Sequence, residues 1–201
     1  MGKIKFSIIR LPEDNFAWSY SAKELNKIIA DACTAQKLKK VYTSLYGYLE
    51  SLGHSANSYD FSYLGGTVIM VFDSVVICFR IHVSGMIEYL LLNPWEIKPR
   101  IQYDLPPEDR FENDCYFYDM GEEFELEYED AAVENIVVNV TDAYPFKLKG
   151  FDTEAAASAE KQGDLPQGIE FVLDNGVTLG LCGDWMEYFF IRLMKQKNEN
   201  K

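Results

Sequence analysis

The chain has 201 residues, of which 48% are hydrophobic and 25% charged, and its formal net charge is −13. This apolar content excludes a disordered chain, and the length predicts one compact domain over residues 1–201. The negative field repels nucleic acids and anionic membranes, so we expect neither as a direct partner.

Nearly all of the excess negative charge lies in one stretch of the sequence. Residues 96–135 carry 14 acidic and 3 basic side chains, whereas residues 1–50 carry 5 acidic and 8 basic ones. A cluster of this kind speeds the encounter with a basic partner. An acidic balance also keeps a cytosolic protein dissolved, so charge alone leaves both explanations open.

The sequence predicts a cytoplasmic protein without a membrane segment. The start, MGKIKFSIIRLPED, lacks the apolar core of a secretion signal. The longest apolar run, residues 67–79, is interrupted by Asp73 and Ser74 and is shorter than the ~20 residues that span a bilayer.

The cysteines are widely spaced and form no C-x-x-C pair. Each lies within or beside apolar or aromatic residues, which is typical of buried thiols in a reducing compartment. The four positions are Cys33, Cys78, Cys115 and Cys182.

The N-terminal part, residues 1–57, is expected to be mainly helical after a short strand at residues 3–9. Ser21 and Glu24 have the spacing of a capping box, which satisfies backbone donors at a helix start. Apolar residues then recur at helical spacing and predict a helix over residues 22–52, ending at Gly53, or two helices with a break near residues 34–36.

The β-rich part, residues 58–195, begins with a three-stranded meander. Residues 67–72 and 75–83 predict a hairpin around Asp73 and Ser74, and residues 86–92 predict a third strand. The near-continuous apolar character of these segments predicts burial on both faces of the sheet.

A similar pattern recurs late in the chain. Residues 169–173 and 177–182 flank the turn Asp174-Asn175-Gly176, and residues 185–194 form a predicted third strand. Two similar meanders indicate an internal duplication, but any two hairpins with a polar turn also look alike. Between the meanders the pattern predicts strands at residues 115–119, 122–128 and 134–140, and then a helix at residues 152–162.

These elements predict an α+β fold, in which the N-terminal helical segment packs on a mainly antiparallel sheet formed by both meanders and the central strands. Catalytic chemistry has little support in the sequence. Only two histidines occur, His54 and His82, and no nucleophile elbow, metalloprotease or phosphate-loop motif is present. We therefore predict no catalytic residue, no metal and no cofactor.

The most informative segment is residues 121–130, GEEFELEYED. On a strand, Phe124, Leu126 and Tyr128 share one face, and the other face is acidic. Same-face neighbours are about 7 Å apart, within the ~8 Å Debye length at physiological salt, so the carboxylates repel one another and a basic partner would relieve this repulsion. The acidic ridge consists of Glu123, Glu125, Glu127 and Glu129.

An alternative to docking is a solvated strand face on which Lys147 and Lys149 pair with these glutamates. If the ridge docks a partner, the neighbouring tyrosines add contact area and stack on guanidinium groups. The predicted binding residues beside the ridge are Tyr116, Tyr118, Asp119 and Trp95. Trp95 and Trp18 fit an interface or a core equally well.

Small size, acidity concentrated in one segment, a mixed α and β pattern and the absence of a catalytic motif resemble the immunity proteins of bacterial toxin systems. The resemblance implies a cytoplasmic protein, monomer or dimer, that neutralises a cognate basic toxin domain, such as a nuclease, by covering its surface. Two other classes stay open: an assembly subunit that forms a homo-oligomer, and a hydrolase that uses acidic residues.

Overall fold

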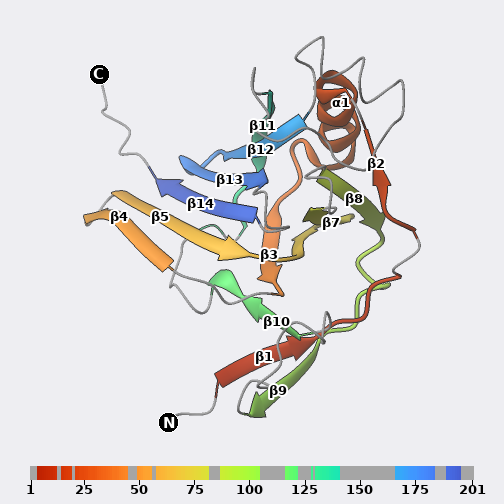
Figure 1. Cartoon of the computed structure of the whole chain (residues 1–201), viewed down its shortest axis with the longest axis vertical. Coiled ribbons are helices and arrows are strands. Elements are labelled where there is room, and N and C mark those ends of the chain that lie inside the picture. Colours follow the sequence, from red (N-terminus) through yellow and green to blue (C-terminus); the bar gives the residue numbers. More distant parts are fainter. Residues whose placement is uncertain are drawn as a thin grey trace, which may run out of the picture.

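The fold was obtained as a computed structural model of the whole chain (Figure 1). The structure describes residues 4–12, 15–19, 21–44, 49–55, 58–81, 87–104, 116–121, 128, 130–140, 166–183 and 189–195.

Within the described residues, eight antiparallel strands form a first sheet in the order β2-β8-β7-β6-β3-β10-β1-β9. Some neighbours in this sheet are far apart in the sequence. For example, β3 pairs with β6 on one side and with β10 on the other. The strands are β1 (Ile4–Ile8), β2 (Ala17–Trp18), β3 (Leu38–Thr43), β6 (Val68–Phe72), β7 (Val76–Ile81), β8 (Ile87–Leu92), β9 (Arg100–Asp104) and β10 (Tyr116–Asp119).

A second sheet has six strands in the described part, in the order β11-β12-β13-β14-β5-β4. The helix α1 (Ala22–Cys33) lies beside its β11 edge (Figure 1). This arrangement confirms the α+β fold with an N-terminal helix on a mainly antiparallel sheet. The strands are β4 (Leu49–Ser55), β5 (Ser58–Gly65), β11 (Val133–Val140), β12 (Pro166–Leu173), β13 (Val177–Gly183) and β14 (Phe189–Lys195).

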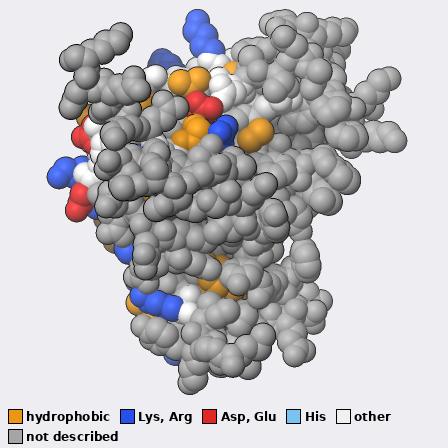
Figure 2. Space-filling model, turned by 90° about the vertical axis from the view of Figure 1, so that its left-hand side faces the viewer, with side chains coloured by type: hydrophobic (Ala, Val, Ile, Leu, Met, Phe, Trp, Pro, Cys, Tyr) orange, Lys and Arg blue, Asp and Glu red, His pale blue; other side chains and the backbone are white. Residues whose placement is uncertain are grey.

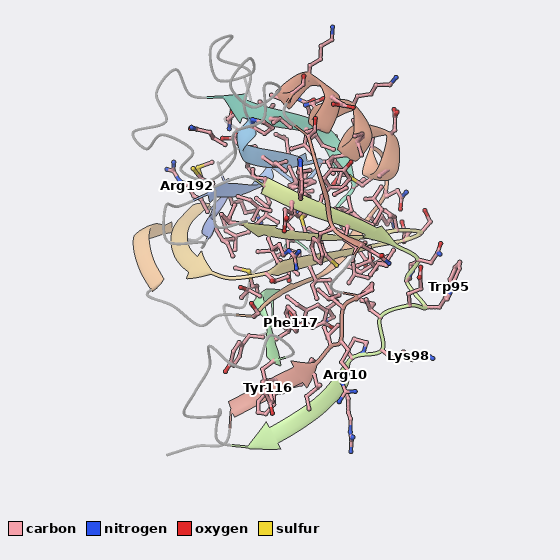
Figure 3. The ribbon with its side chains drawn as sticks, turned by 45° about the vertical axis from the view of Figure 1, so that its right-hand side comes forward. Arg10, Trp95, Lys98, Tyr116, Phe117 and Arg192 are labelled. Carbon is pink, nitrogen blue, oxygen red and sulfur yellow. The ribbon has the colours of Figure 1, made fainter. Side chains whose placement is uncertain are left out.

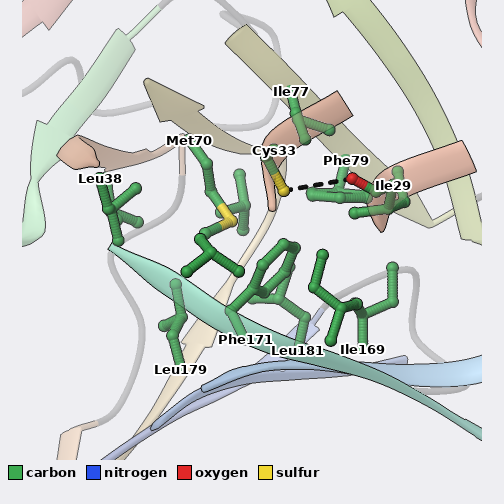
Figure 4. Close-up of a cluster of buried hydrophobic side chains, with 14 of the residues drawn as sticks. Ile29, Cys33, Leu38, Met70, Ile77, Phe79, Ile169, Phe171, Leu179 and Leu181 are labelled. Atoms are coloured by element: carbon green, nitrogen blue, oxygen red, sulfur yellow. Dashed lines mark hydrogen bonds between the residues drawn. The ribbon is translucent and has the colours of Figure 1, made fainter. Parts of the chain in front are cut away.

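One hydrophobic core joins the helix and both sheets (Figure 4). Alternate residues of β6, β7, β12, β13 and β14 point into it, as the two-residue period of a strand requires. The ring of Phe171 on β12 lies 6.4 Å from the ring of Phe72 and 6.0 Å from that of Phe79. The two sheets therefore pack face to face through aromatic side chains.

The first sheet is buried on its other face as well. Ile69, Val76 and Cys78 point away from the main core and form a second cluster with Ile9 and Phe117. This arrangement explains why the strands of the first meander read as continuous apolar runs, and it confirms the expected burial on both faces.

The predicted helix over residues 22–52 is too long. α1 ends at Cys33, and Ala35 has a φ of 64°, a conformation that takes the chain out of the helix. The predicted start is confirmed, since the Ser21 side chain accepts a hydrogen bond from the Glu24 N–H, and so is the break, since α1 ends at Cys33. The second half of the capping box differs: the Ser21 N–H donates to Ser19 Oγ, and the Glu24 carboxylate accepts from the Ser19 hydroxyl. After the break the chain forms strand β3 instead of a second helix.

A β-bulge explains why this strand looked helical. The register between β3 and β6 shifts between Leu38 and Lys40, so Leu38 and Val41, three residues apart, both point into the main core. A spacing of three is also that of a helix face. Gly53, predicted to end the helix, instead lies in β4, where the register with β5 shifts between Ser51 and Gly53.

The two meanders, β6-β7-β8 and β12-β13-β14, lie in two different sheets, whereas the sequence pattern predicted one shared sheet. Each is preceded in the sheet by a strand with the same bulge: Leu38 opposes Phe72 and Val133 opposes Leu173, and each register shifts at the next step. Both meanders thus share one geometry. The strands predicted near residues 115–119 and 134–140 are confirmed, whereas the strand at 122–128 and the helix at 152–162 lie outside the described residues, apart from Tyr128.

Candidate functional site

The acidic ridge, Glu123, Glu125, Glu127 and Glu129, lies outside the described residues. Two residues of the same segment are described and lie close together: Gly121, at its start, and Tyr128, between Glu127 and Glu129. A Cβ atom added to Gly121 would lie only 2.9 Å from the hydroxyl oxygen of Tyr128. Gly121 therefore lies beside the end of the Tyr128 side chain. We call the described residues of this region the β10 anchor: residues 116–121, 128 and 130.

Tyr128 fixes one end of the anchor. Its side chain is fully buried, and its hydroxyl oxygen accepts a hydrogen bond of 3.1 Å from the backbone N–H of Val41 on β3. The Tyr128 carbonyl accepts a hydrogen bond from the Ala131 N–H. A buried tyrosine needs such a partner for its hydroxyl, and here the partner is a strand whose sequence pattern predicted a helix.

Asp119 fixes the other end. One carboxylate oxygen accepts a hydrogen bond of 2.8 Å from Lys40 Nζ, and the other accepts one of 3.0 Å from the Gly121 N–H. The Asp119 side chain is 12% exposed, so this ion pair is better shielded from solvent than a typical surface pair. The Asp119 carboxylate thus connects β10 to β3 through Lys40, and to the start of the acidic segment through Gly121.

Lys39 pairs with two further acids next to the anchor. Its Nζ donates to Asp130 and lies 3.2 Å from Asp73. The hydrogen bond with Asp130, followed by that with Asp73, raises the pKa of Lys39. The pKa of Asp130 is lowered, chiefly by its hydrogen bond with Lys39. Both lysines of β3 are thus engaged by acids outside the ridge.

The predicted tyrosines occupy different environments on β10. Tyr116 is half-buried, and its ring meets the ring of Phe6 edge-on at 5.1 Å. Tyr118 is 3% exposed, which leaves almost none of its surface for a partner because it packs inside the fold. Of the two, Tyr116 is the one that a partner can reach.

Trp95 is far more exposed, at 71%. It lies in a tight turn after β8, in which the Glu96 carboxylate accepts hydrogen bonds from the Asn93 backbone and side chain. Figure 3 shows Trp95 pointing outward on one side of the molecule, away from Tyr116. The structure therefore brings Tyr116, Tyr118 and Asp119 together on β10 but places Trp95 elsewhere. Trp18, which the sequence left open, is 40% exposed on β2.

The sequence did not single out Lys39 or Lys40, and it gave Gly121 and Asp130, the two ends of the acidic segment, no structural role. The sequence pattern that could have identified Lys39 and Lys40 is residues 38–43, LKKVYT. Its β-branched and aromatic residues favour a strand, and the strand carries both lysines. On the face shown in Figure 2, described acidic and basic side chains likewise lie next to each other.

One further charged pair in the described part lies within the fold. Glu88 is 2% exposed and pairs with Arg80, whose guanidinium carbon lies 4.0 Å from the centre of the Phe16 ring. No group of three or more metal-ligating side chains occurs among the described residues. The side chain of His54 and all of His82 lie outside them.

Two of the predicted thiols are buried as expected. Burial raises the pKa of Cys33 and of Cys78 to about 12, and the Cys33 thiol donates to the Ile29 carbonyl. A thiol with such a pKa is a poor nucleophile near neutral pH because almost none of it is thiolate. Cys182 differs from the expectation, since it is exposed.

Comparison with protein-family models, curated proteins and solved structures finds no match to the chain. None of the described segments forms a helix with the length and hydropathy needed to cross a membrane.

Proposed function

We propose that this chain is an immunity-type binding protein, which neutralises a cognate basic toxin domain, such as a nuclease, in the cytoplasm by direct contact. The contact surface is the acidic ridge, Glu123 to Glu129, with Tyr116 at its edge. The proposal extends the resemblance to immunity proteins to a specific place in the fold, the segment held by the β10 anchor.

The observation that carries the proposal is the ion pairing of the lysines next to the anchor. Lys40 is paired with Asp119, and Lys39 with Asp130 and Asp73. Within the described part of the chain, the lysines of β3 beside the anchor thus pair with acids that are not ridge glutamates. A row of like charges next to cations that have other acidic partners favours a basic partner.

The anchor itself supports a docking role. Gly121 and Tyr128 sit side by side against β3, and the Tyr128 hydroxyl and the Asp119 carboxylate fix both residues to the sheet. A binding segment whose ends are fixed loses less conformational entropy on association than one whose ends are free.

The test is affinity capture from a lysate of the source organism, with the wild-type chain and the variant Glu123→Gln/Glu125→Gln/Glu127→Gln/Glu129→Gln as paired baits. We expect a basic protein that the wild type retains at low salt, that about 0.5 M salt releases, and that the variant does not retain. The purified partner should lose its own activity when the wild-type chain is added. A retained protein that does not distinguish the two baits contradicts the ridge as the contact surface.

A further inference from the structure

Strand β9 is the last strand of the first sheet in the described part of the chain. Within the part of the chain that the structure describes, β9 pairs with β1 on one side and has no strand on the other. Its first two residues are both exposed, Arg100 and Ile101, and Ile101 is 53% exposed. Free backbone donors and acceptors along such an edge are a template for pairing with another strand.

The other described edges are protected. β2 has only two residues, and the pairing of β4 with β5 is irregular. The β11 edge is covered, because Asn26 of α1 donates to the Ile136 carbonyl at 2.8 Å and the Val133 N–H donates to the Gln36 carbonyl at 3.0 Å. By contrast, β9 pairs with β1 over five consecutive residues without a shift. β9 is the regular and uncovered edge in the described structure.

The sequence of β9, RIQYD, is complementary to itself in the antiparallel direction. If two copies pair about Gln102, Arg100 of each copy faces Asp104 of the other, and Ile101 faces Tyr103. Opposite charges and aliphatic–aromatic pairs are the cross-strand neighbours that stabilise an antiparallel pair. Within its own chain, Arg100 faces Ile8 and Asp104 faces Ile4, so neither has an opposite charge directly across from it in the sheet.

In this register the contact is limited to the strand itself, because Lys98 faces Pro106, which has no backbone N–H to donate. A twofold axis through Gln102 makes this a closed, isologous contact and not an open chain.

We propose that two copies of this protein associate through β9, pairing antiparallel about Gln102 and joining their first sheets into one. The proposal is independent of the function proposed above, since the acidic ridge takes no part in the contact. A strand of five residues gives a small interface, so the dimer depends on concentration and weakens as salt screens the two Arg100–Asp104 pairs.

A charge swap measured by sedimentation velocity tests the pairing. Arg100→Asp and Asp104→Arg each place like charges across the interface and should raise the dimer dissociation constant roughly ten-fold or more. The double variant restores opposite charges, and its constant should return to within about three-fold of the wild type. A wild type that stays monomeric up to about 1 mM, or single variants that dimerise like the wild type, overturns the proposal.

Cross-linking tests the register separately. In a background with Cys115 and Cys182 replaced by serine, Gln102→Cys should form an intermolecular disulfide on mild oxidation, because directly opposed Cα atoms lie about 5 Å apart. Lys98→Cys is the matched control, since the two copies of residue 98 lie roughly 26 Å apart in this register. Equal cross-linking of the two variants contradicts pairing about Gln102.

Discussion

Asp73 and Asp174 make the same contact in the two sheets. The Asp73 carboxylate accepts a hydrogen bond from the Lys37 N–H at 3.0 Å, and the Asp174 carboxylate accepts one from the Ala132 N–H at 3.1 Å. Lys37 and Ala132 are themselves partners in an antiparallel bridge. The turns of two equivalent hairpins are therefore tied together at the point where the two sheets meet.

The Asp73 contact predicts a dependence of stability on pH. The backbone hydrogen bond from Lys37, and then that from Lys39, lower the pKa of Asp73 below its ordinary value of 3.8. A lowered pKa stabilises the fold above the unfolded-state value, and this contribution is lost as the pH falls through the folded-state value. Asp73→Asn should lose part of the acid sensitivity that the wild type shows below about pH 4, as measured by urea unfolding at several pH values. Asp31→Asn, which leaves the Lys37 contact in place, should keep it; equal behaviour of the two variants contradicts this role.

The packing of the two sheets predicts a large cost for removing Phe171. This fully buried ring contacts both Phe72 and Phe79 of the opposite sheet. Phe171→Ala should lower the free energy of unfolding by about 3–5 kcal/mol, because it leaves a cavity between the sheets. Phe171→Leu, which keeps most of the volume, should cost clearly less. Similar losses for both would argue against a ring that bridges the sheets.

The β10 anchor predicts coupling between Tyr128 and Gly121. Tyr128→Phe leaves the Val41 N–H without its acceptor and should cost about 1–3 kcal/mol. Gly121→Ala places a methyl group 2.9 Å from the Tyr128 hydroxyl oxygen and should also destabilise the fold. The double variant should cost less than the sum of the single variants, since removal of the hydroxyl makes room for the methyl. Additive effects in the double-mutant cycle would show that the two residues do not touch.

The buried thiols predict a loss of stability in alkaline solution. Burial raises the pKa of Cys78 from 9.0 to about 12. Between these values the unfolded chain loses the thiol proton and the folded chain retains it, so stability falls as the pH rises, by about 1.4 kcal/mol per pH unit for one thiol. Cys78→Ala should show a shallower fall above pH 9 than the wild type, whereas Cys182→Ala, at an exposed position, should match it. Parallel curves for all three proteins would contradict the buried thiol.

Local chemistry made much of the fold predictable. Ser21 starts the helix through its own side chain, and the Asp73-Ser74 and Asp174-Asn175-Gly176 turns mark both hairpins. Helix length was not predictable, because the bulge in β3 gives the buried Leu38 and Val41 the spacing of a helix face. The division into two sheets depends on contacts between distant segments, which no local pattern encodes.

The candidate site shows the same limit. Charge clustering in the sequence identified the acidic segment and the strand at Tyr116–Asp119 beside it. The lysines that pair with acids at the β10 anchor, Lys39 and Lys40, lie in a segment for which the sequence pattern predicted a helix. Trp95 is exposed, but no sequence pattern could show that it lies away from β10, since that depends on how β8 and β10 are placed in the sheet.

The most direct test of the proposed function is the affinity of the captured basic partner for two variants of equal net charge. One neutralises Glu123, Glu125, Glu127 and Glu129 as glutamines. The other neutralises four acids elsewhere, with Asp31 changed to asparagine and Glu134, Glu154 and Glu160 changed to glutamine.

If the ridge is the contact surface, the first variant binds at least about ten-fold more weakly, with a smaller dependence on salt, and the second stays close to the wild type. Equal affinities for the two variants would mean that only the overall charge matters, which would contradict a specific acidic docking surface.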